Sequence, residues 1–258
     1  MKALVTGGGA RLGQAMALYL GRRGYDVAVH YAGSQAGAAD TVSQLAALGR
    51  TGVTLQADLL DEDETQALVS RATDALGGPL TCLINNASIF EHDTLATATR
   101  DSWDRHIGSN LRAPFVLSQK FAAQVPAPAI DDAGEPVAQG LILNMIDQRV
   151  HKLTPEFMTY TIAKMGLWAM TRTTAQALAP RVRVNGIGPG PTLQGHRQSK
   201  DHFDRQRAAT LLKRGANPSD VTAALGYFLD APAVTGQMIA ADGGQHLAWE
   251  TPDVLGVE

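Results

Sequence analysis

The stretch 2-KALVTGGGARLGQAMALYL-20 contains a short apolar run, a glycine-rich turn and an amphipathic pattern in direct succession. The run KALV is typical of a buried strand, and the pattern from Leu12 to Arg22 has the period of a helix. Gly7 and Gly13 lie in the turn between them, where glycine allows the chain to reverse direction tightly. The stretch therefore predicts a strand, a tight turn and a helix whose first backbone N–H groups are free.

The rest of the chain repeats this unit. Apolar runs of strand length occur at Lys2–Val5, Asp26–His30, Gly52–Gln56, Cys82–Asn85, Leu141–Met145, Arg183–Ile187 and Gln237–Ala241. Helical patterns occur at Leu12–Arg22, Gly37–Leu48, Asp61–Leu76, Arg100–Ala123, Tyr160–Leu178 and Pro218–Leu229. Buried strands that alternate with helices favour a parallel sheet covered on both faces. We predict an α/β protein in which residues 1–258 form a single Rossmann-type, doubly wound domain of about seven strands.

The composition is that of a globular protein. Hydrophobic residues make up 45% and charged residues 18%, and the net charge of −3 gives no reason to expect nucleic acid or a membrane surface as a partner. The single cysteine, Cys82, lies in a predicted strand and is expected to be a core residue. No apolar run reaches membrane-spanning length, and no leader precedes the first strand. We expect a cytoplasmic protein, and we predict no metal site.

Three segments do not fit the alternating pattern. The polar segment 126-PAPAIDDAGEPVAQG-140 is expected to be a surface loop. Residues 190–215, between the sixth strand and the last helix, are long enough to form a substrate lid. The tail 245-QHLAWETPDVLGVE-258 is expected to cover a neighbouring subunit or active site, or to pack on its own subunit.

Four motifs follow the predicted strands in order: 6-TGGGARLG-13, 85-NNAS-88, the pair Tyr160 and Lys164, and 188-GPGPT-192. Together with 236-GQMIAADGG-244, they resemble the short-chain dehydrogenase/reductase family over essentially the whole chain. The glycine-rich turn can accept a diphosphate at the helix start, whereas in isolation it would be compatible with a plain turn. The resemblance implies that NADPH or NADP+ is held by Gly7, Arg11, Leu12, Gly13, His30, Ser34, Asp58, Leu59, Asn86, Ala87, Ser88, Tyr160, Lys164, Pro189, Gly190 and Thr192.

The end of the second strand favours NADPH over NADH. An acid at this point would receive the ribose hydroxyls and select against a 2′-phosphate, but 28-AVHYAGS-34 has none. Ser34 can donate to a phosphate, and His30 and Arg11 are expected to add positive charge. By the resemblance Asp58 meets the adenine; otherwise it is a turn or helix-cap residue.

Tyr160 and Lys164 are expected to act together. Positions four apart share one face of a helix, and an ammonium group stabilises a phenolate. A phenol tuned in this way can give a proton to the atom left negative by hydride transfer. The resemblance implies that Asn110, in 108-GSNLRAPF-115, continues a proton relay through Lys164; alternatively, Asn110 satisfies helix backbone groups.

Asp147, in 144-NMID-147, departs from the pattern of most family members, which carry serine at this place. This Asp, 85-NNASIF-90, Arg11 in the glycine-rich turn and GPGPT occur together in the pteridine reductases, a branch that the sequence resembles. The resemblance implies reduction of a pterin C=N bond, with Tyr160 and Asp147 in the proton transfer. A carboxylate can also accept the ring's N–H donors, while Phe90 would stack on the ring and Arg11 and Ser88 would contact the ligands.

Other interpretations stay open. Asp147 would cap a turn in a carbonyl reductase that acts on an oxoacyl, sugar or steroid ketone. A non-catalytic NADPH sensor is a third interpretation, although it would not need Asn110, Tyr160 and Lys164. The small-residue helix 163-AKMGLWAMTRTTAQALA-179 resembles the family's subunit-contact helix and predicts a homotetramer or homodimer.

Overall fold

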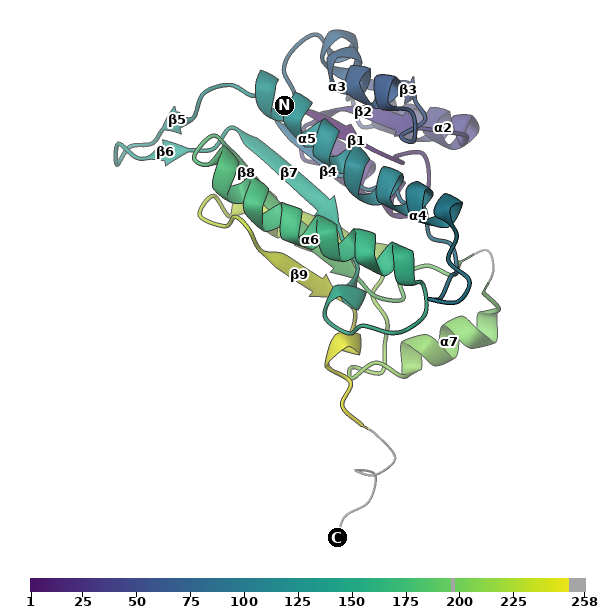
Figure 1. Cartoon of the computed structure of the whole chain (residues 1–258). Coiled ribbons are helices and arrows are strands. Elements are labelled where there is room, and N and C mark those ends of the chain that lie inside the picture. The colour runs from purple at the N-terminus through teal and green to yellow at the C-terminus, as the bar shows by residue number, and fades with distance from the viewer. Residues whose placement is uncertain (196–197, 251–258) are drawn as a thin grey trace.

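The computed structural model describes residues 1–195 and 198–250 and forms one α/β domain (Figure 1). Seven parallel strands form the central sheet in the order β3-β2-β1-β4-β7-β8-β9. They are β1 (Lys2–Val5), β2 (Asp26–Tyr31), β3 (Gly52–Gln56), β4 (Cys82–Asn85), β7 (Gly140–Met145), β8 (Val182–Pro189) and β9 (Met238–Ala241). The predicted fold class is confirmed, and the predicted strand bounds differ from these by at most two residues.

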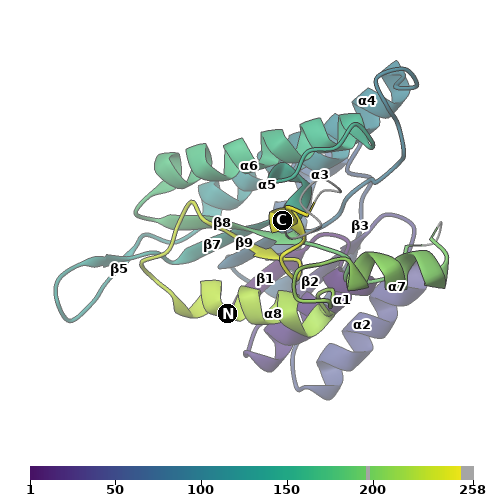
Figure 2. The same cartoon turned by 90° about the horizontal axis from the view of Figure 1, so that it is seen from below.

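Helices cover both faces of the sheet. The helices are α1 (Arg11–Arg22), α2 (Gln35–Ala47), α3 (Glu62–Leu76), α4 (Arg100–Ile107), α5 (Ala113–Gln124), α6 (Met158–Leu178), α7 (Lys200–Ala208) and α8 (Pro218–Asp230). Figure 2 shows α1, α2 and α8 on one side of the sheet and α3, α5 and α6 on the other. None of the helices in the described part of the chain has the length and apolarity needed to cross a membrane.

The strands of the centre are buried on both faces. In β1, Ala3 and Val5 pack into the core under α1 and α8, whereas Leu4 points to the opposite core under α3 and α5. All three side chains are 0% exposed. Because successive side chains of a strand point to opposite faces, an uninterrupted apolar run is what a sheet covered on both sides requires.

Two predicted elements differ from the structure. The segment 126–140 contains an exposed antiparallel hairpin, β5 (Ala129–Ile130) and β6 (Pro136–Val137), where a loop was predicted. Its turn is closed by Asp131, whose Oδ1 accepts hydrogen bonds from the N–H groups of Ala133 and Glu135. The predicted single helix 100–123 is interrupted by five residues of π-helix, Gly108–Arg112, which separate α4 from α5. Pro114 at the start of α5 has no N–H to continue the regular pattern.

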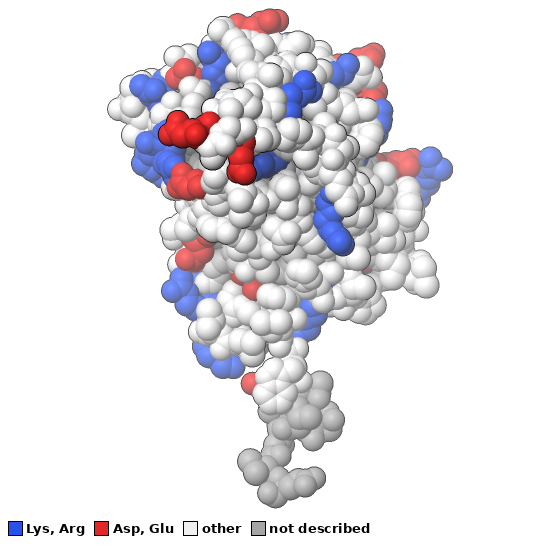
Figure 3. All heavy atoms as spheres, turned by 90° about the vertical axis from the view of Figure 1, so that its left-hand side faces the viewer, with Lys and Arg blue, Asp and Glu red and all other residues white. Residues whose placement is uncertain are grey.

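Charged side chains are interspersed on the face shown in Figure 3, where acidic and basic groups surround a largely uncharged middle. Opposite charges close to one another give a weak net field on this face. On α6, Ile162 and Met165 are 42% and 38% exposed. The proposed role of this helix in subunit contact stays a prediction.

Candidate active site

A cavity of about 1050 Å³ lies at the carboxyl ends of the strands. The turns after β1, β4 and β7 line it, together with the segment after β8 and the helix α7. Parallel strands bring all these turns to one edge of the sheet, where ligands of open α/β folds bind. The predicted lid contributes His202, Phe203 and Gln206 to the wall, while its residues 196 and 197 lie outside the described part. Its closure stays a prediction, as does the role of the tail, of which residues 251–258 lie outside that part.

The glycine-rich turn fits a diphosphate. Gly7 has φ +61°, and a Cβ added to Gly13 would lie 2.0 Å from the Gly7 carbonyl oxygen. The residue before α1 is Ala10, whose side chain cannot cap the helix. The first backbone N–H groups of α1 therefore have no capping side chain and could bind a phosphate. Thr6 joins this turn to the next one, because its Oγ1 accepts from the N–H groups of Asn86 and Ala87, at 2.9 and 3.0 Å.

The remaining predicted cofactor residues fall mostly on the same edge. Leu12, Asn86, Ala87 and Ser88 line the cavity beside the glycine-rich turn, as do Pro189, Gly190 and Thr192 after β8. Asp58 and Leu59 line it after β3, and Asp58 also caps its own turn by accepting from Leu60 N at 2.9 Å.

Ser34 is exposed and is not part of the cavity wall as the described residues form it. It directly precedes α2, and its hydroxyl makes no capping hydrogen bond to that helix. Its hydroxyl and the start of α2 therefore remain available to a group that extends past Ala32, which does line the cavity.

His30 does not supply the positive charge that we expected. The side chain is 1% exposed; its Nδ1 accepts from Gly7 N at 3.1 Å, and its Nε2 lies 3.0 Å from the Ala57 carbonyl oxygen. This pattern requires the neutral ring with the proton on Nε2. Burial lowers the pKa of His30 from its ordinary value. The residue fixes the glycine-rich turn and is not a cation.

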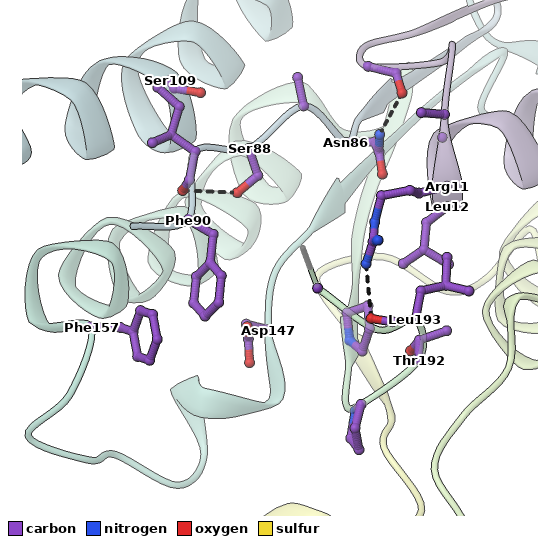
Figure 4. A pocket seen from close by; sticks show the side chains of 18 of the residues that line it. Arg11, Leu12, Asn86, Ser88, Phe90, Ser109, Asp147, Phe157, Thr192 and Leu193 are labelled. Atoms are coloured by element: carbon purple, nitrogen blue, oxygen red, sulfur yellow. Dashed lines mark hydrogen bonds between the residues drawn. The ribbon is translucent and has the colours of Figure 1, made fainter. Parts of the chain in front are cut away.

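Arg11 bridges the cavity. Its guanidinium donates to the carbonyl oxygens of Leu193 and Gln194, at 2.9 and 2.8 Å, in the segment after β8 (Figure 4). Its backbone has φ +53°, the left-handed region that favours glycine. An arginine held in this conformation ties the glycine-rich turn to the predicted lid, so its expected contacts with the ligands would require a change of partner.

Asp147 and Tyr160 are joined at the centre of the site. The Tyr160 hydroxyl donates to Asp147 Oδ2 at 2.9 Å. The other carboxylate oxygen, Oδ1, accepts from Arg149 N at 2.8 Å and caps the 3-10 turn Gln148–Val150. One oxygen caps a turn, as the structural interpretation of Asp147 predicts, and the other faces the phenol; the role of Asp147 toward a pterin stays a prediction.

Protons are held tightly by this pair. Burial raises the pKa of Asp147, and burial followed by the charge of Asp147 raises the pKa of Tyr160 well above 10. Lys164 lies over the Tyr160 ring, with Nζ 5.6 Å from the ring centroid, and its expected effect on the phenolate stays a prediction. Lys164 Nζ donates to the Met145 carbonyl oxygen at 2.7 Å, and burial lowers the pKa of Lys164 to about 8. Tyr160 is therefore a phenol at neutral pH, with an acceptor beside it.

Asn110 lies in the π-helical segment and is 0% exposed. Its side chain is bound by Ile89, with Oδ1 accepting from the Ile89 N–H at 2.9 Å and Nδ2 donating to the Ile89 carbonyl at 2.8 Å. These bonds fix the 85–90 turn, so the side chain of Asn110 satisfies backbone groups of a turn and not, as the structural interpretation expects, those of a helix. The proposed relay through Lys164 would have to use the main chain of Asn110, where the π-helix shifts the usual hydrogen-bond pattern.

Phe90 forms an aromatic wall with a residue that the sequence analysis missed. Its ring stacks on Phe157, with centroids 4.3 Å apart and planes at 9°, and lies edge-on to Tyr160 at 4.7 Å. Figure 4 shows both phenylalanine rings on the Asp147 side of the site. Phe157 lies just before α6 with φ +57°, so helical spacing from Tyr160 does not place its ring and the sequence carries no simple signal for it.

A buried polar network holds the start of α6. Asp93 is 2% exposed, and its carboxylate accepts from Thr159 N and Thr159 Oγ1 and from Ser102 Oγ. His106 Nδ1 lies 2.6 Å from Thr159 Oγ1, and the Asp93 carbonyl accepts from Phe157 N at 2.8 Å. None of these polar groups was a predicted site residue. Their contacts fix the turn on which Phe157 and Tyr160 stand.

Comparison with known proteins assigns the family. The profile of the family described as enoyl-(acyl carrier protein) reductase matches residues 9–246. A short-chain dehydrogenase/reductase of Armillaria gallica is 30% identical over 260 residues, which is 94% of this chain and 94% of that protein. The chain belongs to the short-chain dehydrogenase/reductase family. It is therefore an oxidoreductase by family, and the predicted family is confirmed.

Two further members of the short-chain family point to different substrates. The 3-oxoacyl-[acyl-carrier-protein] reductase FabG of Staphylococcus epidermidis is 29% identical over 250 residues, 95% of this chain and 98% of that protein. The solved structure of FolM alternative dihydrofolate reductase 1 from Brucella suis, in complex with NADP, is 41% identical, with a TM-score of 0.90 and 98% coverage of each chain. The cofactor of that complex is the one that the sequence predicts.

No group of three or more His, Cys, Asp and Glu side chains suited to a metal ion occurs within residues 1–195 and 198–250. Cys82 is buried in the sheet, and burial raises the pKa of its thiol to about 12.

Replacing Tyr160 with Phe should separate binding from chemistry. The hydroxyl is bound to Asp147 and makes no hydrogen bond to the glycine-rich turn among the described residues, so we expect NADPH affinity to change by less than about twofold. Turnover should fall by roughly 100-fold or more, as is typical for loss of a general acid. Fluorescence titration with NADPH and steady-state kinetics measure the two effects. Retained turnover would show that another group gives the proton.

Replacing Asp147 with Asn should stabilise the fold near neutral pH. Because its folded-state pKa is raised, the ionised carboxylate is less favourable in the fold than in the unfolded chain, and the fold loses stability as pH rises through that raised pKa. Below about pH 4 the carboxyl is protonated in both states and makes no difference. Thermal unfolding from pH 4 to 8 should show a gain that grows with pH, roughly 2–4 °C for each kcal/mol. A less stable variant at pH 7 would contradict the raised pKa.

Proposed function

We propose that this protein is an NADPH-dependent reductase of dihydropterins, including dihydrofolate-type substrates. The observation that carries the proposal is the hydrogen bond from Tyr160 to Asp147 beside the stacked rings of Phe90 and Phe157. A flat bicyclic ring can stack on this wall. The carboxylate can accept the ring's N–H groups, which a serine hydroxyl would serve less well. The likeness to the Brucella suis dihydrofolate reductase supports the same substrate class.

The reaction adds hydride to the ring carbon of a C=N bond and a proton to its nitrogen. NADPH, bound along the glycine-rich turn, would supply the hydride. The fit of this cofactor rests on Gly7 and Gly13, because a side chain at either position would collide with the backbone or with Asn86 in the turn that would hold the diphosphate.

Tyr160 and Asp147 would supply the proton. The phenol keeps its proton at neutral pH, and Asp147 can carry a proton because burial raises its pKa. As the ring nitrogen takes the phenolic proton, Asp147 is placed to return one to Tyr160 over 2.9 Å. Lys164 stays between the β7 carbonyl at Met145 and the tyrosine ring, and its charge offsets the negative charge that develops at the pair.

Reduction of a ketone is the second candidate, and the likeness to the Staphylococcus epidermidis oxoacyl reductase supports it. A ketone oxygen becomes negative as hydride arrives, and it requires hydrogen-bond donors. In its ionised form Asp147 would place a carboxylate against that oxygen, whereas the serine of most family members would place a hydroxyl donor there. The physical chemistry of this side chain therefore favours a ring nitrogen over a carbonyl oxygen.

Substitutions at Asp147 separate the two candidates. Asp147→Ser restores the side chain common in the family, and it should lower dihydrobiopterin turnover by roughly 100-fold while leaving activity on an acetoacetyl thioester unchanged or raised. Asp147→Asn should keep pterin binding better than turnover, because it preserves hydrogen bonding without exchanging a proton. NADPH affinity serves as the folding control. Full dihydropterin activity in the Ser variant would remove the main support for the proposal.

Cofactor choice should depend on the residue before α2. No acidic residue occurs between the end of β2 and Ser34, so catalytic efficiency should be higher with NADPH than with NADH. Ser34→Asp should shift the ratio toward NADH by roughly tenfold or more, because a carboxylate repels the 2′-phosphate. Ser34→Asn is the matched control without charge. Equal efficiencies of the parent enzyme with both cofactors would exclude this assignment.

A further inference from the structure

Arg149 occupies a distinctive position in the cavity wall. It lies two residues after Asp147, and its guanidinium is 4.9 Å from the centroid of the Phe157 ring and 6.0 Å from that of Phe90. Arg149 and Asp147 line the same cavity. Its positive charge reaches Asp147, whose pKa it lowers against the larger effect of burial.

Arg149 forms no direct ion pair with a carboxylate among the described residues, although its charge acts on Asp147 at longer range. None of the ion pairs within the described residues includes it, whereas Arg105 pairs with Glu91 and Arg112 with Glu62. The nearby Glu156 contacts His92 instead. One N–H of Arg149 donates to Thr154 Oγ1 at 2.8 Å. The other guanidinium donors have no protein acceptor among those residues, although a guanidinium carries five N–H groups in a fixed plane.

Stacking on the aromatic wall prepares this guanidinium to bind an anion. A guanidinium that lies over a ring keeps its N–H donors at the edge of its own plane, where they can meet a carboxylate in a bidentate pair. The ring contacts also restrict the side chain before a ligand arrives, which lowers the entropy cost of forming that pair. The unpaired charge and the aromatic contacts therefore favour an anionic ligand group beside an aromatic one.

We propose that Arg149 binds a carboxylate on the tail of the substrate while the pterin ring stacks on Phe90. This inference rests on the proposed function and deepens it, because it selects dihydropterins that carry an acidic tail, such as the glutamate of dihydrofolate, over those without one. The ring would lie near Asp147, and the tail would leave it along the Phe157 side, toward Arg149. Arg149 would then determine specificity without taking part in proton transfer.

The experiment compares 7,8-dihydrofolate with 7,8-dihydrobiopterin, which has no carboxylate, under NADPH. For Arg149→Gln, the ratio of kcat/KM for dihydrofolate to that for dihydrobiopterin should fall by roughly tenfold, the effect of one lost charged hydrogen bond, and the loss should appear in KM. Arg149→Lys should restore part of the ratio, since it keeps the charge but not the bidentate geometry. Added salt should lower the ratio in the parent enzyme and have little effect in the Gln variant.

Arg172→Gln is the matched control. Arg172 lies 5.8 Å from the Trp168 ring on α6, outside the cavity wall, so the same substitution of a stacked arginine should leave the ratio unchanged. An equal effect of Arg149→Gln on both pterins, or no effect, would overturn the role of Arg149 while dihydropterin reduction stands. Reduction of neither pterin by the parent enzyme would overturn the proposed function and this inference with it. If Arg149→Gln lowered kcat/KM only for acetoacetyl-coenzyme A, Arg149 would bind a phosphate group of that substrate and not the carboxylate of a pterin tail. This result would also overturn the inference.

Discussion

The burial of the central strands on both faces is the constraint from which the site follows. With Ala3, Leu4 and Val5 all enclosed, no polar side chain can stand in the middle of β1 without losing its hydrogen bonds to water. Functional groups are therefore confined to the turns beyond the carboxyl ends of the strands, where the chain leaves the sheet. Thr6 and Asn86 belong to two such turns, and they bond each other directly.

At this edge the protein holds a carboxyl and a phenol together in a place where neither ionises easily. Tyr160 gains a fixed acceptor, and Asp147 remains partly satisfied by the backbone of Arg149. A hydrogen-bonded pair with raised pKa values keeps a proton available at neutral pH. The same burial lowers the pKa of Lys164 to about 8, so its charge is held at some cost to the fold. The polar network at Asp93 supports this arrangement, because it fixes the first turn of α6.

The aromatic wall gives this edge its shape. Phe157 has φ +57° and lies immediately before α6, so its ring turns back onto Phe90 and does not continue along the helix face. The Asp93 carbonyl accepts from its N–H and holds this conformation. The wall therefore depends on a backbone feature, and Arg149 lies against it from the turn after β7.

The sequence by itself determined the alternation of strands and helices, the edge of the sheet that carries the site and most of its residues. Apolar runs, helical periods and glycine spacing are local properties, and a parallel sheet converts them into a common edge. Only the tertiary structure decided the state of each group. His30 is neutral because burial and two backbone partners fix its tautomer. The side chain of Asn110 is hydrogen-bonded to the backbone of Ile89. The hydroxyl of Tyr160 is hydrogen-bonded to Asp147 and not to Lys164. Phe157 and Arg149 became site residues through contacts across the fold. Burial and hydrogen-bond partners set protonation and orientation, and they arise from segments that are distant in the sequence.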